Sequence, residues 1–422
     1  MSLCAVLVQC SDMNSPQSLR WIVLSLGIAA NLTQGINYVG SVISEPLVKM
    51  VEIPDAEIRA HWATLFSLGI LFLPLGMICA GWLTDKKSPR IPIALGAIIF
   101  SSGLFLASVS TSYLFLCITF GFMVSLGSGL AYGPIVASAV RWFPDRRGLA
   151  SGLAVAAVAF GPVWMAPFCN AMLAHGFHIA TILQCLGVIG LIAIGAAAVF
   201  ITAPPSNLQE MLKPAPAKTG ADAKPAPPTA ARELAWTGMI RTTDFWILFL
   251  FFVLGTMPGL MLLSQAQPIF IALGGFELGT AALLVAVLAA ANATGRALWG
   301  TISDYLGRIN TLTVMFVCSA VAMFTLPFAA NPVLLVAVIL VIGTTFGGYL
   351  GLFPSFCADS FGLKNTSLNY AVLFIAFAVS AIVGPRLYVV MASPQYAFFT
   401  AAILALLGAI GAVIYKVRKM QK

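Results

Sequence analysis

The sequence has very few charged residues: 9% of its 422 positions are Asp, Glu, Lys or Arg, whereas 60% are hydrophobic. Soluble domains carry roughly 25% charged residues, so this chain lacks the polar side chains needed to cover a folded surface in water. Lipid must therefore surround much of it. Within lipid every backbone N–H and C=O needs an internal partner, which only helices and closed barrels supply. The apolar runs are much longer than the alternating strands of a barrel, so an all-α membrane protein is expected.

The sequence also lacks the motifs of a catalytic or metal centre. Its eight cysteines are scattered without CxxC or CxxxH spacing, so no disulfide framework or metal site is predicted. No Walker motif for ATP is present, and His, Asp and Glu do not cluster at a membrane interface. We expect neither an enzyme nor an ATP-driven pump, and no cofactor. Residues 1–10 lack the basic segment and cleavage site of a signal peptide, and Met13 is a second candidate start.

Twelve uninterrupted apolar runs, each long enough to cross a bilayer, divide the chain. Six lie in the first half, near residues 21–46, 60–83, 91–109, 113–140, 149–173 and 178–203. Six lie in the second half, near 245–271, 279–303, 309–329, 332–357, 368–391 and 395–415. Between them, the Pro-, Ala- and Lys-rich composition is typical of a solvated, semi-extended linker. We expect an end segment over 1–20, a bundle over 21–203, a linker over 204–244, a second bundle over 245–415 and a tail over 416–422.

The basic residues predict the orientation of these spans. With both termini in the cytoplasm, eighteen of the 22 Lys and Arg residues fall in cytoplasmic segments, and only Lys49 and Arg59 fall on the opposite side. This asymmetry is the positive-inside pattern of membrane proteins. It accounts for the net charge of +8 without a basic binding face, so nucleic acid is not an expected partner. We expect a monomer that crosses the inner or plasma membrane many times, with the lipid bilayer around it.

One motif occurs at matching places in the two halves. After the second span the sequence reads GWLTD up to Asp85 and continues to Arg90; after the eighth it reads GTISD up to Asp304 and continues to Arg308. In both copies an Asp and an Arg flank a tight cytoplasmic turn. Either copy alone is consistent with loop capping, but the repetition indicates two related halves. We expect Asp85 with Arg90, and Asp304 with Arg308, to form charged latches that hold one access state closed.

These motifs, on two six-span halves joined by a polar loop, resemble the major facilitator superfamily over residues 20–416. Finer blocks are similar to the oxalate/formate antiporter family, which is related to the monocarboxylate transporters: RWFPDRRGLASG from Arg141, NATGR ending at Arg296, LFPS ending at Ser355, and Asn369-Tyr370. The resemblance implies two six-helix bundles that rock around a midplane site for small organic anions. It also implies that Arg296 binds a carboxylate. Oxalate-type members carry a lysine on the eleventh span, where this sequence has Phe377.

Arg296 is the most informative single residue, because it is a charge well inside the eighth span. A guanidinium is costly in hydrocarbon and usually faces a cavity or a partner. The alternative is that its long side chain snorkels to the cytoplasmic interface. No acid in the neighbouring spans is an evident partner. An incoming carboxylate, which arginine binds in bidentate geometry, is therefore the expected counter-ion.

Other side chains at midplane depth are expected to complete this site. Four offer hydrogen-bonding groups: Asn37, Tyr38, Tyr132 and Tyr349. By the resemblance, the first three match positions that line the family's pocket. Phe346 and Phe377 would make the wall apolar, which suits an alkyl tail beside the carboxylate. For each of these residues, ordinary helix packing is the alternative role.

No titratable carboxylate or histidine lies near the midplane, where proton symporters commonly place one. Glu277 is a peripheral acid on the external side, and Arg386 lies near the external end of the eleventh span. Arg386 is expected either to anchor the span or pair with an acid such as Glu277, or to serve as an external gate for anions. Coupling is expected to be anion exchange, or proton symport with the proton on the substrate or on Glu277.

The sequence thus predicts a secondary transporter of small monocarboxylates of the lactate, pyruvate or formate class. Two alternatives stay open. The first is a dicarboxylate exchanger of the oxalate:formate type, which Phe377 disfavours because a dianion would lack its second cation. The second is a sensor of the same fold that does not transport; such proteins usually need an added cytoplasmic domain, which the short linker does not supply.

Overall fold

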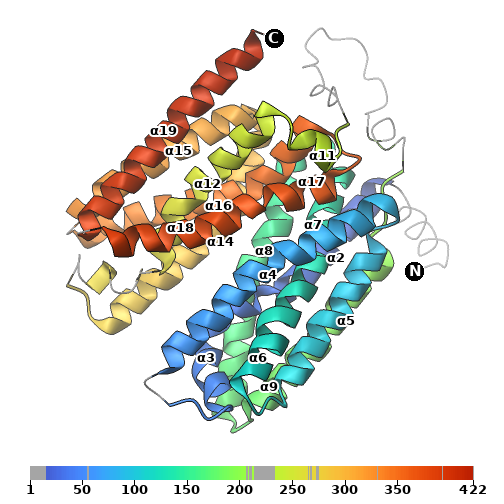
Figure 1. The fold of residues 1–422 in the computed structure, drawn as a ribbon, viewed down its shortest axis with the longest axis vertical. Coiled ribbons are helices and arrows are strands. Elements are labelled where there is room, and N and C mark those ends of the chain that lie inside the picture. The colour runs from blue at the N-terminus through green and yellow to red at the C-terminus, as the bar shows by residue number, and fades with distance from the viewer. Residues whose placement is uncertain are drawn as a thin grey trace, which may run out of the picture.

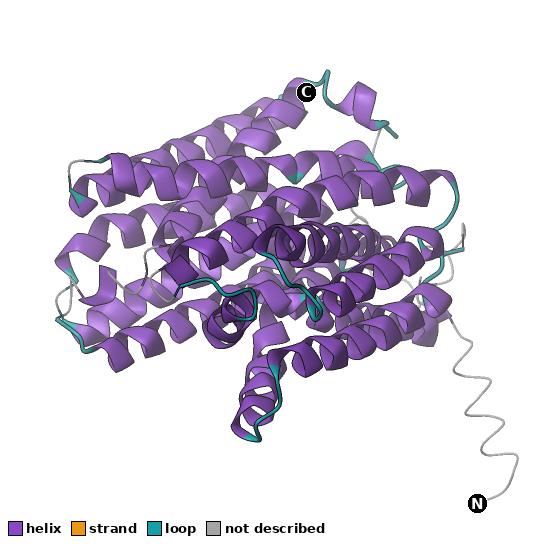
Figure 2. Ribbon diagram, turned by 60° about the horizontal axis from the view of Figure 1, so that its bottom comes forward, coloured by secondary structure: helices purple, strands orange, loops and turns teal. Residues whose placement is uncertain are grey.

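The computed structural model describes residues 16–54, 57–205, 233–264, 275–329, 331–391 and 393–421, with a few isolated positions between them. Every regular element in these ranges is a helix (Figures 1 and 2). Eleven described helices are long and apolar enough to cross a membrane, and Ser18–Thr33 is a further, shorter apolar helix. The predicted all-α architecture is confirmed. The first 15 residues and the middle of the linker, residues 213–232, lie outside the described ranges.

The first six-helix bundle occupies residues 16–200. Its helices are α2 (Pro16–Thr33), η1 (Gly35–Val39), α3 (Gly40–Lys49), α4 (Ile58–Lys86), α5 (Arg90–Ala107), α6 (Tyr113–Leu116), η3 (Cys117–Met123), α7 (Val124–Trp142), α8 (Arg147–Ala174) and α9 (Ile179–Phe200). The π-helical segment η3 continues α6 into α7, so these three elements make one span. The elements α2, η1 and α3 together fill the place of the first predicted span.

The second six-helix bundle follows the linker. Its helices are α11 (Trp236–Met239), α12 (Thr243–Ser264), α14 (Leu278–Leu306), α15 (Arg308–Thr325), η4 (Leu326–Phe328), α16 (Pro332–Phe361), α17 (Thr366–Leu373), α18 (Ile375–Val390) and α19 (Pro394–Met420). The short α11 precedes the first span of this bundle. The helices α17 and α18 are separated by a single residue and form one span.

The first span is not the continuous helix that its apolar run, residues 21–46, predicts. The α-helix ends at Thr33, and a 3₁₀ turn follows before α3. At this point side chains bond locally: Thr33 Oγ1 donates to the Ala30 carbonyl at 2.7 Å, and Gln34 Nε2 donates to Asn31 Oδ1 at 3.0 Å. Such bonds compete with the helical ladder. Gly35 then allows a close approach, because a Cβ there would lie 2.5 Å from the Val158 carbonyl oxygen.

Close backbone contacts hold the helices of each bundle together. A Cβ on Gly129 of α7 would lie 2.2 Å from the Leu73 carbonyl oxygen of α4. In the second bundle, a Cβ on Gly347 of α16 would lie 1.9 Å from the Asn292 carbonyl oxygen of α14. Small residues at such crossings are typical of membrane helices, which associate through tight packing. Large apolar side chains such as Ile192 of α9 point outward instead, as suits a lipid-facing surface.

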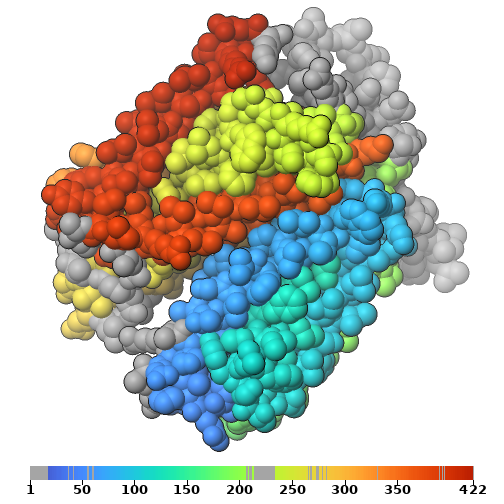
Figure 3. Space-filling view, viewed as in Figure 1, coloured from blue at the N-terminus to red at the C-terminus, as the bar shows by residue number. Residues whose placement is uncertain are grey.

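The two bundles meet at one end of the molecule and part toward the other. At the meeting end, α4 and α14 finish and α8 and α17 begin; we call it the linker end, because the chain enters and leaves residues 206–232 there (Figure 1). The hydrogen bonds described between the bundles all lie between this end and Arg296. The space-filling view shows the bundles separating toward the opposite end (Figure 3).

Candidate functional site

Arg296 lies on α14 at the interface of the two bundles and is 3% exposed. Its Nη1 donates across the interface to the Val155 carbonyl oxygen of α8 at 3.0 Å, and its Nε donates to Asn292 Oδ1 at 3.3 Å. Its Nη2 is buried, and no described atom accepts a hydrogen bond from it. None of the described ion pairs includes this guanidinium. A buried cation with a free N–H is placed to bind an anion, because an unpaired charge in such a site is costly.

Arg296 lines a cavity between the bundles with about 60 Å³ of space for the centres of water molecules. The other lining residues are Gln34, Tyr38, Leu73, Ser128, Tyr132, Val158, Leu350, Phe374 and Phe377. They come from the first, second, fourth and fifth spans of one bundle and from the tenth and eleventh spans of the other. Among these described residues Arg296 carries the only charge, and no Asp, Glu or His is present. The cavity is thus an apolar chamber with one cation and several polar side chains.

The structure brings Tyr38, Tyr132 and Phe377 to this cavity beside Arg296, and their role in binding a substrate stays a prediction. Tyr132 is buried within electrostatic range of Arg296, and its ring centroid lies 6.2 Å from that of Phe374. Phe377 packs beside Phe374 with ring centroids 5.1 Å apart and ring planes tilted by 36°, so the wall near the guanidinium is aromatic. Asn37, the other pocket residue expected from the first span, has a side chain outside the described part of the structure.

Phe346 and Tyr349 do not line the cavity, so their predicted placement is wrong. Both lie on α16 and pack against α12: a Cβ on Gly259 would lie 2.3 Å from the Phe346 side chain, and one on Gly255 would lie 2.6 Å from the Tyr349 ring. Leu350 is the α16 residue that reaches the cavity. The sequence indicates the depth of these side chains in the span, but the packing of α12 on α16 decides the direction in which they point.

Gln34 is a polar lining residue that the sequence motifs do not single out. It is 5% exposed, and its Oε1 is buried with no hydrogen-bond partner among the described residues. The signal that points to it is the group of polar residues Asn31, Thr33 and Gln34, which interrupts an otherwise apolar span. Polar side chains inside a membrane usually face a cavity or another helix, so this run marks the wall of the site.

At the linker end, Asp85 of α4 joins the first bundle to the start of α17. Its carboxylate accepts from Arg141 Nη2 at 2.7 Å and from the Leu368 backbone N–H at 3.0 Å. Arg141 also donates to the carbonyl oxygens of Leu363 and Lys364, at 3.0 and 2.8 Å. The turn between α16 and α17 is therefore held by an acid and a base of the other bundle.

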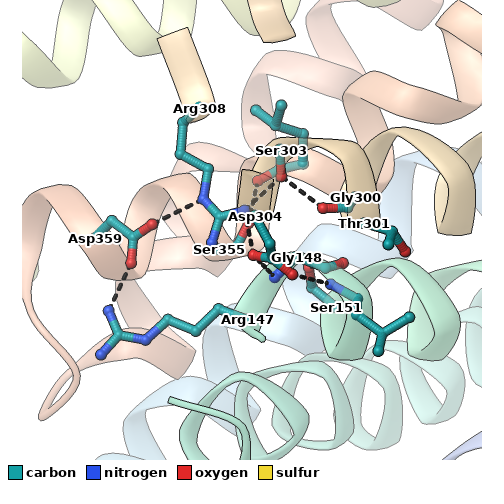
Figure 4. A network of polar contacts seen from close by, with 12 residues as sticks. Arg147, Gly148, Ser151, Gly300, Thr301, Ser303, Asp304, Arg308, Ser355 and Asp359 are labelled. Atoms are coloured by element: carbon teal, nitrogen blue, oxygen red, sulfur yellow. Dashed lines mark hydrogen bonds and ion pairs between the residues drawn. The ribbon is translucent and has the colours of Figure 1, made fainter. Parts of the chain in front are cut away.

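Asp304 of α14 makes the equivalent contact in the opposite direction, from the second bundle to the start of α8 (Figure 4). Its two carboxylate oxygens accept from the backbone N–H groups of Gly148 and Leu149, both at 2.8 Å. A carboxylate suits a helix N-terminus, where N–H groups lack helical partners and the helix dipole is positive. Asp85 and Asp304, the two acids of the repeated motif, thus occupy matching positions at α17 and α8.

Two arginines and Asp359 of α16 extend this network (Figure 4). Asp359 accepts from Arg147 Nη1 of the first bundle at 2.5 Å and from Arg308 Nε at 2.8 Å. Arg308 also pairs with Asp304 at 2.7 Å, so the expected association of these two residues is present. The sequence motifs do not predict the contributions of Asp359 and Arg147. We call the contacts of Asp85, Arg141, Arg147, Asp304, Arg308 and Asp359 the closing layer.

Arg90 does not belong to the closing layer, so its predicted pairing with Asp85 is wrong. It is the first residue of α5, is exposed, and borders a surface groove between α5 and α9. Arg141, at the end of α7, takes the place beside Asp85 instead. The reason is that α4 packs against α7, which brings the end of α7 next to Asp85.

Glu277 and Arg386 both lie apart from the cavity and are exposed. Neither contributes to an ion pair in the described ranges, where Glu45 pairs with Lys49. The expected salt bridge of Arg386 is therefore not observed. Within the same ranges, no group of three or more His, Cys, Asp or Glu side chains is arranged to hold a metal ion.

Two bundles of membrane-crossing helices thus bury Arg296 between them, with no acid partner among the described residues, and close at one end through a charged layer. The chain belongs to the Major Facilitator Superfamily, whose family model matches residues 23–385. The family resemblance seen in the sequence motifs is confirmed.

Relatives of known name agree with this assignment. The chain is 28% identical over 386 residues to the oxalate:formate antiporter of Oxalobacter formigenes, covering 88% of this chain and 87% of the relative. It is 26% identical over 328 residues to monocarboxylate transporter 12 of Xenopus laevis, covering 73% of this chain and 70% of the relative. The crystal structure of the superfamily transporter FucP in the outward conformation shares its fold, with a TM-score of 0.69, 16% identity, and coverage of 94% of this chain and 99% of that one.

Proposed function

We propose that this protein carries small monocarboxylates across the membrane by alternating access, with Arg296 binding the carboxylate. The observation that carries the proposal is the buried Arg296 Nη2, which has no described partner and belongs to a side chain that lines the cavity. The guanidinium has no described acid to neutralise it, so a carboxylate from the substrate supplies the missing charge. A charge-assisted, bidentate contact is the strongest that an arginine makes.

A single cation favours a single carboxylate. The second charge of oxalate would lie near Phe374 and Phe377, which offer no counter-charge. Burying an unpaired charge costs several kcal/mol, roughly a hundredfold or more in binding. One relative is named an oxalate:formate antiporter and another a monocarboxylate transporter. The aromatic wall favours a monocarboxylate as the substrate of this chain. The aliphatic tail of a monocarboxylate packs against that wall without loss.

Alternating access follows from the position of the closing layer. We assign the linker end to the cytoplasm, because the Lys and Arg residues concentrate in its loops. The described state is then closed to the cytoplasm, with the cavity beyond Arg296 toward the outside. Opening the cytoplasmic side requires α8 to leave α14, which breaks the contacts of Asp304 and also the bond from Arg296 to Val155. The site and the closing layer are therefore physically linked.

Coupling by anion exchange fits the cavity best. Its described lining contains no Asp, Glu or His to hold a proton. An empty carrier would have to rearrange with an unpaired guanidinium, which a bound anion would neutralise. We therefore assign exchange of one carboxylate for another rather than proton symport.

Uptake of labelled monocarboxylates and oxalate into proteoliposomes tests the site. We expect Arg296→Gln to lower the uptake of every carboxylate by about a hundredfold, because it removes one partner of a buried charged pair. The matched control is Arg418→Gln, in the exposed last turn of α19, which should transport like the wild type. Normal transport by Arg296→Gln would refute the proposed site. Phe377→Lys should raise oxalate uptake relative to that of the monocarboxylates, and an unchanged ratio would refute the role of the missing cation.

The coupling mode is tested with the same proteoliposomes under an imposed proton gradient. With no anion inside, an acidic exterior should drive little accumulation of labelled monocarboxylate, whereas preloading with unlabelled monocarboxylate should restore rapid uptake. Strong accumulation into anion-free vesicles would show that protons drive transport and would exclude pure exchange.

A further inference from the structure

We propose that the preferred substrate carries a hydroxyl as well as its carboxylate, and that Gln34 recognises this hydroxyl. The inference rests on the proposed function, since it takes Arg296 as the carboxylate's partner. It goes beyond that function by selecting one chemical class of monocarboxylate, the hydroxy acids, over keto acids and unsubstituted acids. The observation behind it is a hydrogen-bond acceptor in the cavity wall whose orientation is fixed.

A chain of hydrogen bonds fixes the orientation of the Gln34 amide. Asn31 Nδ2 donates to the Ala154 carbonyl oxygen of α8 at 2.8 Å. Because a carbonyl oxygen cannot donate, the nitrogen of the Asn31 amide must lie on that side and Oδ1 on the other. Asn31 Oδ1 accepts from Gln34 Nε2 at 3.0 Å, and Nε2 also lies 3.4 Å from the Ala30 carbonyl oxygen. Two acceptors hold the nitrogen of Gln34, so its oxygen is the atom left over.

Gln34 Oε1 is an acceptor in need of a donor. The side chain is 5% exposed and lines the cavity, and no described group donates to Oε1. Native structures leave few buried polar atoms unsatisfied, and such exceptions call for a functional explanation. A donor on the substrate would satisfy this oxygen.

Two adjacent carbonyl groups of α8 position the side chains of Gln34 and Arg296, the first of them through Asn31. The Ala154 oxygen of α8 binds Asn31, which orients Gln34, and the next oxygen, of Val155, binds Arg296 Nη1. The remaining Oε1 of Gln34 and Nη2 of Arg296 both belong to side chains that line the same cavity. The site therefore offers a cationic donor and a neutral acceptor in fixed positions.

A hydroxy monocarboxylate matches this pair of groups. Its carboxylate accepts from Arg296, and its hydroxyl donates to Gln34. A keto acid presents a second acceptor to Oε1, and an unsubstituted acid leaves Oε1 unpaired. An amino acid would bring an ammonium group near Arg296, where like charges repel, and would offer three donors to one free acceptor.

Transport by the wild-type protein gives the first test. Lactate and propanoate differ only by one hydroxyl, and pyruvate replaces that hydroxyl with a carbonyl. In proteoliposomes we expect kcat/KM for lactate to exceed that for propanoate and for pyruvate by about tenfold, the usual consequence of leaving a buried polar group unpaired. Equal values for lactate and propanoate would overturn the inference while leaving the monocarboxylate function intact.

A pair of glutamine variants gives the second test. Gln34→Leu should bring the lactate-to-propanoate ratio of kcat/KM down to about one, whereas Gln184→Leu should keep the wild-type ratio. Gln184 is a matched control, because it also lies within a span of the first bundle but bonds to Ser108 outside the cavity. An unchanged ratio in Gln34→Leu would refute the role of Gln34. A wild-type protein that shows no specificity for carboxylates would instead refute the proposed function.

Discussion

Replacing Asp304 with Asn should open the linker end of the transporter. The two oxygens of Asp304 accept from Gly148 and Leu149 of the other bundle, each at 2.8 Å. Asparagine has one acceptor oxygen and no charge, so it loses one of these bonds and weakens the other. The ion pair with Arg308 is lost as well, but both of its members lie in the second bundle. Only the two backbone contacts bear directly on closure.

The size of this effect follows from those two contacts. A hydrogen bond to a charged group contributes about 1.5–3 kcal/mol. Losing one and weakening the other should cost the closed state about 2–4 kcal/mol, which changes the equilibrium between closed and open forms by roughly 30- to 700-fold. The open form should therefore become much more populated.

Alkylation of a buried reporter cysteine measures this population. Ser151 of α8 is fully buried at the bundle interface, where its Oγ donates to the Gly351 carbonyl oxygen at 2.8 Å. In a protein without its eight native cysteines, Ser151→Cys should react with a maleimide from the linker side only when that end opens. Asp304→Asn should raise the reaction rate by the factor given above, until opening no longer limits it.

Asp145→Asn is the matched control for this experiment. Asp145 lies at the same end and pairs with Arg20 at 3.0 Å, but both residues belong to the first bundle. This variant should leave the alkylation rate near that of the parent protein. If Asp304→Asn and Asp145→Asn react equally fast, the carboxylate of Asp304 does not hold the bundles together and the reasoning fails.

Two glycine substitutions should separate closure from folding. In Gly81→Ala the new Cβ would lie 2.5 Å from Leu368 Cα of the other bundle, so the same alkylation assay should report a more open linker end; an unchanged rate would contradict this. In Gly347→Ala the new Cβ would meet the Asn292 carbonyl oxygen within one bundle, so overpacking of about 1–3 kcal/mol should lower the melting temperature in detergent. Gly195 has open space around it, so Gly195→Ala should melt like the wild type. Equal melting temperatures for the wild type, Gly347→Ala and Gly195→Ala would refute the packing argument.

The sequence alone determines the membrane architecture, because the relevant information is local. The scarcity of charge identifies lipid as the solvent, and the length of each apolar run matches the bilayer. A charge inside such a run is conspicuous wherever the neighbouring helices lie, which is why Arg296 can be identified from its span alone. The two motif acids are likewise visible, because Asp85 and Asp304 repeat at the same place in each half.

Only the tertiary structure decides the partners and the directions of the side chains. Asp85 pairs with Arg141, which lies 56 residues away, rather than with the nearby Arg90. The hydrogen bond from Arg296 to Val155 spans 141 residues of sequence. Such contacts depend on which helices are neighbours and how each is rotated about its axis. Neither property follows from a span that is apolar on all sides, because lipid and protein neighbours select similar side chains.

The same limit explains why the sequence misplaces two residues of the site and does not single out a third. Phe346 and Tyr349 have the right depth, but tight glycine contacts with α12 direct them away from the cavity. Gln34 is visible as a polar residue in an apolar span, yet its free acceptor emerges only from the bonds that Asn31 makes with α8. The sequence thus determines that a cation lies within the membrane. The packing of helices from both halves decides which groups face it, and hence which anion it can hold.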